Sequence, residues 1–120
     1  MNHNGYGEWK KCMQIAYYML EGNTAQEAAE EFGISDGYVN HLITNQIRIS
    51  TPRIYEKIKN KPYMVFQRII YRKCSVEEAC SKHRISRKKF DLFLEEILRL
   101  DFKTYVAMRT KIHNAQTACK

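Results

Sequence analysis

No run of apolar residues in this sequence approaches the roughly 20 residues that a helix needs to cross a bilayer. The first seven residues lack a basic stretch followed by an apolar core, so we do not expect a signal peptide. The sequence also lacks the polar–apolar alternation of exposed strands and any low-complexity segment. These absences predict an all-α protein without a membrane partner, located in the cytoplasm.

The features of an enzyme or a metal protein are scarce as well. The four cysteines, at positions 12, 74, 80 and 119, have spacings that fit neither a zinc motif nor a compact disulfide framework. Cys80 and His83 can share a helix face, but two ligands do not make a zinc site. There is no Gly-rich phosphate loop, and the carboxylates fall at helix starts or on exposed faces. We therefore expect reduced thiols, no metal, no cofactor and no enzymatic activity.

The chain instead contains nearly the same segment twice, 51 residues apart, at 24–35 and 75–86. Each copy opens with a capping box, formed by Thr24 with Glu27 and by Ser75 with Glu78. Each continues as a short helix to a tight turn, after which an Ile-Ser pair starts the next helix. This order is typical of a helix-turn-helix, the unit that places one helix in the major groove of DNA.

Around these copies the sequence predicts two tandem trihelical helix-turn-helix units, each followed by a short extra helix. The first unit is expected at 8–61 and the second at 62–114, with flexible tails at 1–7 and 115–120. The boundary is placed by Lys61 and Pro62, which are expected to end the last helix of the first unit.

The helices themselves are predicted from apolar spacing and from start and stop residues. The first helix is expected at 8–21 and the last at 102–114. Gly33 is expected to make the first turn with a positive φ, and Arg84 stands at the matching place in the second copy. The buried stripe predicted for the first helix consists of Trp9, Cys12, Met13, Ala16, Tyr17 and Leu20.

The net charge of +7 is unevenly divided. Residues 1–60 hold 6 Lys or Arg and 7 Asp or Glu, which gives −1. Residues 61–120 hold 14 and 6, which gives +8. We therefore expect the second unit to supply most of the attraction for phosphates, and binding to weaken as salt rises.

The outward face of the third helix in each unit provides the candidate DNA-binding residues. In the first unit Asn40 can contact adenine, and Tyr38 can contact a thymine methyl group or a phosphate. In the second unit Arg87 or Lys88 can contact guanine, while the remaining cations hold phosphates. His41 has an alternative interpretation as a pH-sensitive group. The full set of candidates is Ser35, Asp36, Tyr38, Asn40, His41, Thr44, Asn45, Arg84, Ser86, Arg87, Lys88, Lys89 and Asp91.

The first unit resembles the stage III sporulation protein D family of bacterial transcription regulators over about a third of the chain. The residues that carry the resemblance are Ala28, Ala29, Phe32, Gly33, Ile34, Ser35, Tyr38, Val39, Leu42 and Pro52. The unit is also similar to sigma-factor region 4 and to homeodomain-like domains. Two such units in one chain are similar in plan to Myb repeats, to the arabinose-regulator DNA-binding domain and to transposase ends, which implies that one chain grips adjacent major grooves.

These observations predict a sequence-specific protein that binds double-stranded DNA, a bacterial or phage transcription regulator reading a bipartite site. RNA polymerase or another protein is a further expected partner, and the protein is expected to be a monomer or a dimer. One alternative is the DNA-recognition subunit of a mobile element or of a phage packaging machine, similar to a small terminase. Another is a helical adaptor for RNA polymerase or a sigma factor, which fits the acidic residues Glu27, Glu30 and Glu31.

Overall fold

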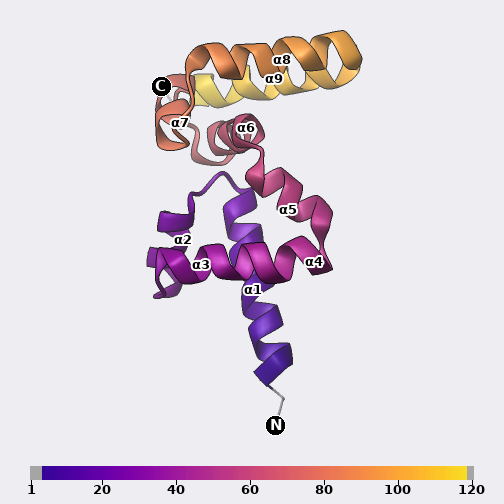
Figure 1. Ribbon diagram of the computed structural model, residues 1–120. Helices are drawn as coiled ribbons and strands as arrows, with labels where there is room; N and C mark the ends of the chain where they lie inside the picture. The colour runs from indigo at the N-terminus through magenta and orange to yellow at the C-terminus, as the bar shows by residue number, and fades with distance from the viewer. Residues whose placement is uncertain (1–3, 119–120) are drawn as a thin grey trace. The chain divides into compact units, whose positions relative to one another are not determined.

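The computed structural model describes residues 4–118, which form helices joined by short turns (Figure 1). No strand occurs among these residues, so the predicted all-α fold is confirmed. The chain divides into two compact units between Asn60 and Lys61. Below, the first unit is the part that ends at Asn60, and the second unit is the part that begins at Lys61.

The first unit is built around its long initial helix. Its elements are α1 (Asn4–Leu20), α2 (Ala25–Phe32), α3 (Asp36–Leu42), the π-helical turn η1 (Ile43–Ile47), α4 (Arg48–Ser50) and α5 (Pro52–Lys59). Because α3, η1 and α4 follow one another without a break, they form one continuous rod. α1 packs against α2, η1 and α5, and α2 packs against α3.

Local chemistry fixes where the helices of the first unit begin and end. Gly22 has a φ of +91° just after α1, in the left-handed region that glycine tolerates. The Thr24 hydroxyl then accepts from the Glu27 N–H at 3.2 Å, and the Glu27 carboxylate accepts from the Thr24 N–H at 2.9 Å. Gly33 ends α2 at φ +67°, and the Ser35 hydroxyl caps α3 by accepting from the Tyr38 N–H at 3.1 Å. The predicted capping box and glycine turn are therefore confirmed.

The buried face of α1 differs from the predicted stripe. Trp9 and Tyr17 remain 43% and 56% exposed, although both were expected in the core. Cys12 and Ala16 are buried as predicted, and Ile15 and Met19, which the predicted stripe leaves out, are buried beside them. The buried face is therefore rotated about the helix axis toward Ile15 and Met19, because aromatic residues with a polar group tolerate water at the surface.

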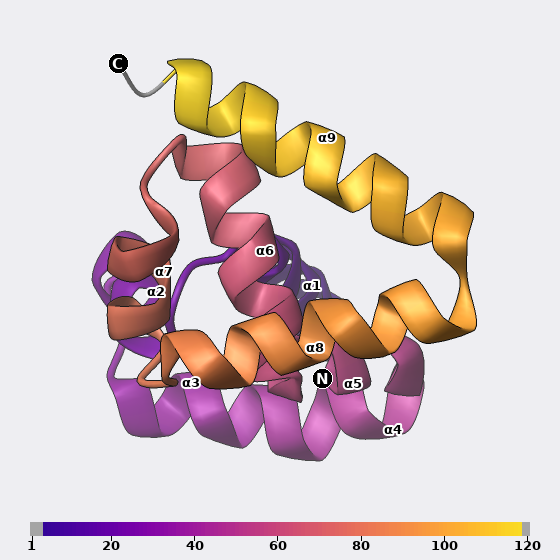
Figure 2. The same ribbon diagram turned by 90° about the horizontal axis from the view of Figure 1, so that it is seen from above.

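The second unit repeats this plan with four helices. They are α6 (Lys61–Arg72), α7 (Val76–Lys82), α8 (Arg87–Leu100) and α9 (Phe102–Ala118). α6 packs against the other three, and Figure 2 shows it lying between α8 and α9. The core of the second unit includes Phe66, Ile69, Phe90, Leu94 and Met108. The capping box of Ser75 and Glu78 is present, as predicted.

Several predicted boundaries are wrong. Lys61 and Pro62 begin α6 instead of ending α5, because proline fits the first turn of a helix, where its missing N–H is not needed. The last helix is not short: α9 has 17 residues and continues past 114 to Ala118. Its end is held because Ala115 is buried and the Gln116 side chain donates to the Cys74 carbonyl at 3.2 Å.

The tails predicted at 1–7 and 115–120 are also helical wherever the structure describes them. α1 already begins at Asn4, and 115–118 belong to α9. Once part of a helix is packed, each residue added at its end forms one hydrogen bond while only two dihedral angles become fixed. The helix therefore continues past its buried part. Residues 1–3 and 119–120 lie outside the described residues.

The turn between the paired helices has the same form in both units. Gly33 and Arg84 both adopt a left-handed conformation, at φ +67° and φ +59°. The N–H of the next residue then bonds back to the preceding helix, from Ile34 to the Ala29 carbonyl and from Ile85 to the Cys80 carbonyl, each at 3.0 Å. The turn conformation that the repeat implies is therefore kept without a glycine in the second unit.

The rod of the first unit corresponds to α8 of the second unit, and the π-helical turn η1 is the main local difference between them. Ser35 and Ser86, which cap them, are 51 positions apart, whereas Thr51 and Asp101, which follow them, are 50 apart. η1 therefore takes up one extra residue in the first unit, as a single π turn can within an α-helix. Buried Ile58 of α5 and buried Met108 of α9 also differ by 50 positions.

Candidate nucleic-acid interface

The predicted residues of the first unit lie along the exposed face of α3 and η1, with Ser35 at the cap of α3. Asp36, Tyr38, Asn40, His41 and Asn45 are exposed, while Thr44 is half-buried. Opposite them, Val39, Leu42 and Ile43 are buried, so the rod presents one polar face and one packed face. Ser35 is exposed, but its hydroxyl is used as the α3 cap. The face is polar with little charge, which suits hydrogen bonding to base edges.

Three of these residues form a contact cluster, which we call the Tyr38–His41–Asn45 cluster. The rings of Tyr38 and His41 stack with centroids 6.1 Å apart and planes 15° apart. His41 Nδ1 and Asn45 Nδ2 lie 2.8 Å apart, at hydrogen-bonding distance. Both contacts join residues one helical turn apart, so the cluster holds three polar side chains together on the exposed face.

The first turn of α8 carries Arg87, Lys88 and Lys89, and all three are exposed. Positive charge at this end of a helix is unfavourable, because the unpaired N–H groups there already carry partial positive charge. The same turn of α3 contains the acidic residue Asp36 instead. Cations in an electrostatically unfavourable position make this turn a candidate site for an anionic partner.

Arg87 is held by two carboxylates. Its Nε lies 3.1 Å from Asp91 Oδ1 on α8, and its Nη1 pairs with Glu77 Oε2 of α7. The hydrogen bond to Asp91 is the first cause of the raised pKa of Arg87. Lys88 and Lys89 form no ion pair with another described residue. Arg87 is therefore held by two ion pairs, whereas Lys88 and Lys89 are exposed to solvent.

The turn before α8 adds further polar groups to this surface. Arg84, the residue with a left-handed conformation in the turn between α7 and α8, is exposed. Ser86 is also exposed, but its hydroxyl accepts from the Lys89 N–H at 3.1 Å and is therefore used as a cap. Arg84, Lys88 and Lys89 consequently lie close together in the chain around one helix start, with Arg87 fixed beside them.

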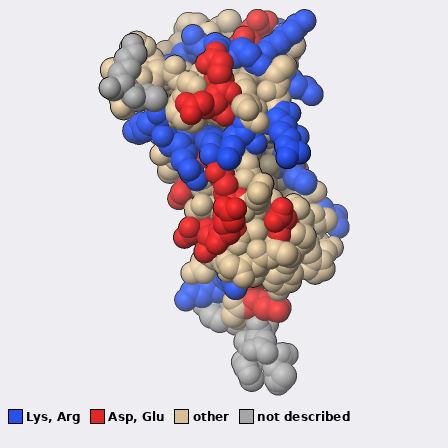
Figure 3. Space-filling model, turned by 90° about the vertical axis from the view of Figure 1, so that its left-hand side faces the viewer, with Lys and Arg blue, Asp and Glu red and all other residues tan. Residues whose placement is uncertain are grey.

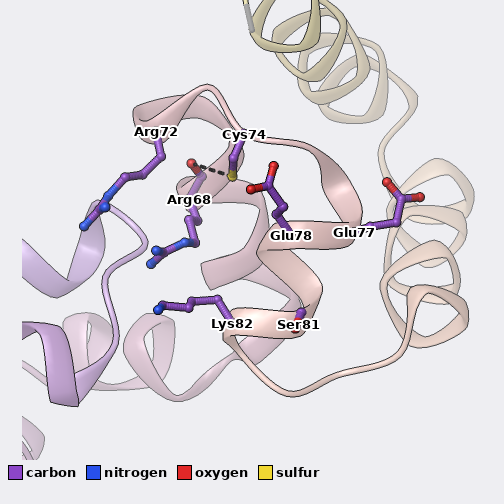
Figure 4. Close-up of a pocket in the computed structure, with 7 residues that line it drawn as sticks. All are labelled: Arg68, Arg72, Cys74, Glu77, Glu78, Ser81 and Lys82. Atoms are coloured by element: carbon purple, nitrogen blue, oxygen red, sulfur yellow. Dashed lines mark hydrogen bonds between the residues drawn. The ribbon is translucent and has the colours of Figure 1, made fainter.

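A hollow of about 600 Å³ lies between α6 and α7. In Figure 4 Arg68, Arg72 and Lys82 extend to one side of it, while Glu77 points away. The Cys74 thiol donates to the Arg68 carbonyl at 3.8 Å, which ties the turn after α6 to the helix. The residues that line the hollow are Arg68, Arg72, Cys74, Glu77, Glu78, Ser81 and Lys82.

Lys and Arg side chains cover much of the part of the second unit that Figure 3 shows. On the first unit, the same view shows Asp and Glu side chains together on the surface. This contrast follows the charges of the two halves of the sequence, −1 and +8. The electrostatic attraction for an anionic partner is therefore concentrated in the second unit.

Sequence reasoning missed the contacts that organise these residues. The spacing of four between His41 and Asn45, and between Arg87 and Asp91, was a visible signal for a helical pair. The link from Arg87 to Glu77 joins two helices across ten positions, so sequence spacing does not reveal it. The signal for η1 was the change in repeat spacing from 51, between Ser35 and Ser86, to 50, between Thr51 and Asp101.

No helix within the described residues is both long and apolar enough to cross a membrane. In residues 4–118 no group of three or more His, Cys, Asp or Glu side chains is placed to hold a metal ion. Cys12, Cys74 and Cys80 are free thiols, and Cys119 lies outside the described residues. Burial raises the pKa of Cys12 and of Cys80, which favours the unreactive protonated thiol.

Comparison with protein-family models, with curated proteins and with solved structures gave no match for this chain.

Proposed function

We propose that this protein binds double-stranded DNA in a sequence-specific manner and acts as a bacterial or phage transcription regulator. Each unit contributes one helix-turn-helix, so the target is a bipartite site with one half-site per unit. The first unit reads bases with a nearly uncharged helix face. The second unit supplies most of the phosphate contacts, and occupancy of the site blocks or recruits RNA polymerase.

The observation that carries the proposal is the first turn of α8. Arg87, Lys88 and Lys89 stand at a helix start where the helix dipole disfavours them, and Lys88 and Lys89 have no acidic partner among the described residues. A phosphate beside this turn would meet both the lysines and the N–H groups of the helix end. The equivalent placement of α3, with its polar face, supports a second reading helix in the first unit.

The test is the selection of bound duplexes from a random pool at near-physiological salt. We expect two short motifs at a fixed spacing. K88E/K89E should bind the selected duplex at least tenfold more weakly, and the slope of log affinity against log salt should fall by about two.

K103E/K111E is the matched control, because it changes the net charge equally on exposed positions of α9. It should retain most of the affinity. Equal losses in the two variants would mean that only the overall charge matters. Absence of any enrichment by the unmodified protein would contradict sequence-specific binding.

A helical adaptor that binds another protein is the second candidate. It is favoured by exposed apolar side chains where α8 meets α9, namely Leu98, Leu100, Phe102 and Val106. Exposed apolar groups that cluster on a surface often mark a protein contact. Indifference to duplex DNA even at low salt would favour this candidate over the first.

A further inference from the structure

The Tyr38–His41–Asn45 cluster has a defined hydrogen-bonding direction. The structure orients the Asn45 amide with Nδ2 2.8 Å from His41 Nδ1, and because an amide nitrogen can only donate, this orientation assigns Nδ1 as the acceptor. A neutral histidine that accepts at Nδ1 carries its proton on Nε2. The other ring nitrogen of His41 is therefore a hydrogen-bond donor on an exposed side chain.

Two neighbours restrict the orientation of this donor. Tyr38 stacks on the imidazole ring from one turn earlier, and Asn45 holds Nδ1 from one turn later. A side chain that is already ordered loses less conformational entropy when it binds. His41 is thus prepared to recognise an acceptor, whereas the neighbouring Asn40 has no contact of this kind in the structure.

The rod under the cluster changes from α-helix to π-helix between His41 and Asn45. Single π turns are rare and occur frequently at functional sites. α8 of the second unit continues as a regular α-helix through the corresponding region. The structural irregularity and the ordered cluster therefore coincide in the unit that has few positive charges.

Guanine is the base that suits a fixed donor best. Its major-groove edge presents two adjacent acceptors, O6 and N7, and no donor, whereas adenine places a donor next to its N7. On the basis of the function proposed above, we propose that His41 is a specificity-determining residue that donates Nε2–H to a guanine in the major groove. Asn45 and Tyr38 act as positioning residues for its ring.

The first step of the test compares duplex selection by the unmodified protein and by His41→Ala. The expected motif contains one guanine at which discrimination falls about tenfold or more in the variant, while the other positions keep their preferences. His113→Ala is the matched control, because His113 is an exposed histidine on α9 of the second unit. It should return the unchanged motif, and circular dichroism should show equal helicity for all three proteins.

The second step replaces that guanine by bases with different functional groups. Inosine retains O6 and N7, so the unmodified protein should bind it as tightly as guanine, and adenine at least tenfold less tightly. His41→Ala should bind all three alike. Asn45→Ala should weaken binding to the guanine site while guanine stays the preferred base, which separates positioning from direct contact.

The outcomes separate this inference from the proposed function. Two enriched motifs with the same preferences in the unmodified protein and His41→Ala would overturn the role of His41 and leave DNA binding intact. A His41-dependent position occupied by a base other than guanine, or inosine bound as weakly as adenine, would also overturn the assignment. No enrichment by the unmodified protein would contradict both.

Discussion

Each unit has two turn residues in the left-handed conformation, which we call its corners, and the residue types differ between the units. In the first unit the corners are Gly22 and Gly33, and in the second they are Lys73 and Arg84. Each of these residues follows a helix, and the cap residue of the next helix comes two residues later. A left-handed residue with a side chain costs about 1–2 kcal/mol, so the second unit holds two less favourable residues in place.

This comparison indicates that the turn geometry is imposed by its neighbours more than by glycine. The hydrogen bonds from Ile34 and Ile85 are the same in both units, and so are the serine caps. The second unit gains cations at both corners. Lys73 also bonds the Ile70 carbonyl at 3.2 Å through its Nζ, which satisfies the end of α6.

The largest expected effect concerns the buried residue in the third helix of each unit. Val39 and Phe90 occupy equivalent positions and are both almost fully buried. Phe90→Ala should lower the free energy of unfolding of the second unit by about 3–5 kcal/mol, because it leaves a large cavity. Val39→Ala should cost the first unit about 2 kcal/mol, since fewer carbons are removed. Hydrogen exchange measured within each unit gives the two values.

Leu92→Ala is the control for this prediction, because Leu92 lies on the same helix as Phe90 but is 52% exposed. It should change the stability by no more than about 0.5 kcal/mol. A loss below about 1 kcal/mol for Phe90→Ala would contradict the core position assigned to this ring.

A smaller effect concerns the two matched corners. A Cβ at position 33 would meet nothing within 4 Å, so Gly33→Ala costs only backbone strain, about 1 kcal/mol. Arg84→Gly should instead raise the stability by about 0.5–1 kcal/mol, because it relieves the same strain. Thermal or urea unfolding measures both changes. Arg84→Ala keeps the strain and removes the charge, so equal stabilisation by the alanine and glycine variants would assign the gain to charge.

The smallest effect is a pH dependence that arises at the start of α9 in the second unit. Asp101 accepts from the Thr104 hydroxyl at 2.7 Å and from the Thr104 N–H at 3.2 Å at the start of α9. These bonds, the hydroxyl first, lower the pKa of Asp101. Its contribution to stability is therefore complete above its unfolded pKa, near 3.9, and disappears as pH falls through the lower folded value.

The check compares melting temperatures of the unmodified protein and Asp101→Ala from pH 7 to pH 2. The difference should be largest at neutral pH and vanish at the acidic end. Thr51→Ala is the matched control, because Thr51 precedes α5 as Asp101 precedes α9 and does not titrate. A pH-independent difference for Asp101→Ala would contradict the assigned role of the ionised carboxylate.

The helix starts and turns were predictable from sequence because their causes lie within a few residues. Thr24 and Ser75 cap with partners three positions away, and the cap of α8 at Ser86 follows the same rule. The buried face of α1 was not predictable in this way. Apolar residues lie on both sides of Cys12 and Ala16, and packing against α2, η1 and α5 buries Ile15 and Met19 while Trp9 and Tyr17 stay exposed.

The candidate site likewise has features that the sequence predicts and features that only the structure reveals. Sequence located the exposed residues on α3 and α8, since hydrophobic spacing fixes which face points outward. It did not reveal that Arg87 is clamped by Glu77, because the two residues belong to different helices. It also assigned His41 no neighbour, although the structure gives it both Tyr38 and Asn45.

The sequence by itself determined the duplicated helix pairs, their caps, the all-α class and the uneven charge, because these depend on residue type and short-range spacing. The tertiary structure alone decided the buried side of α1, the π turn of the first rod and the full length of α9. It also decided that Lys73 adopts a left-handed conformation. Each of these depends on packing or hydrogen bonds between segments whose proximity only the folded chain establishes.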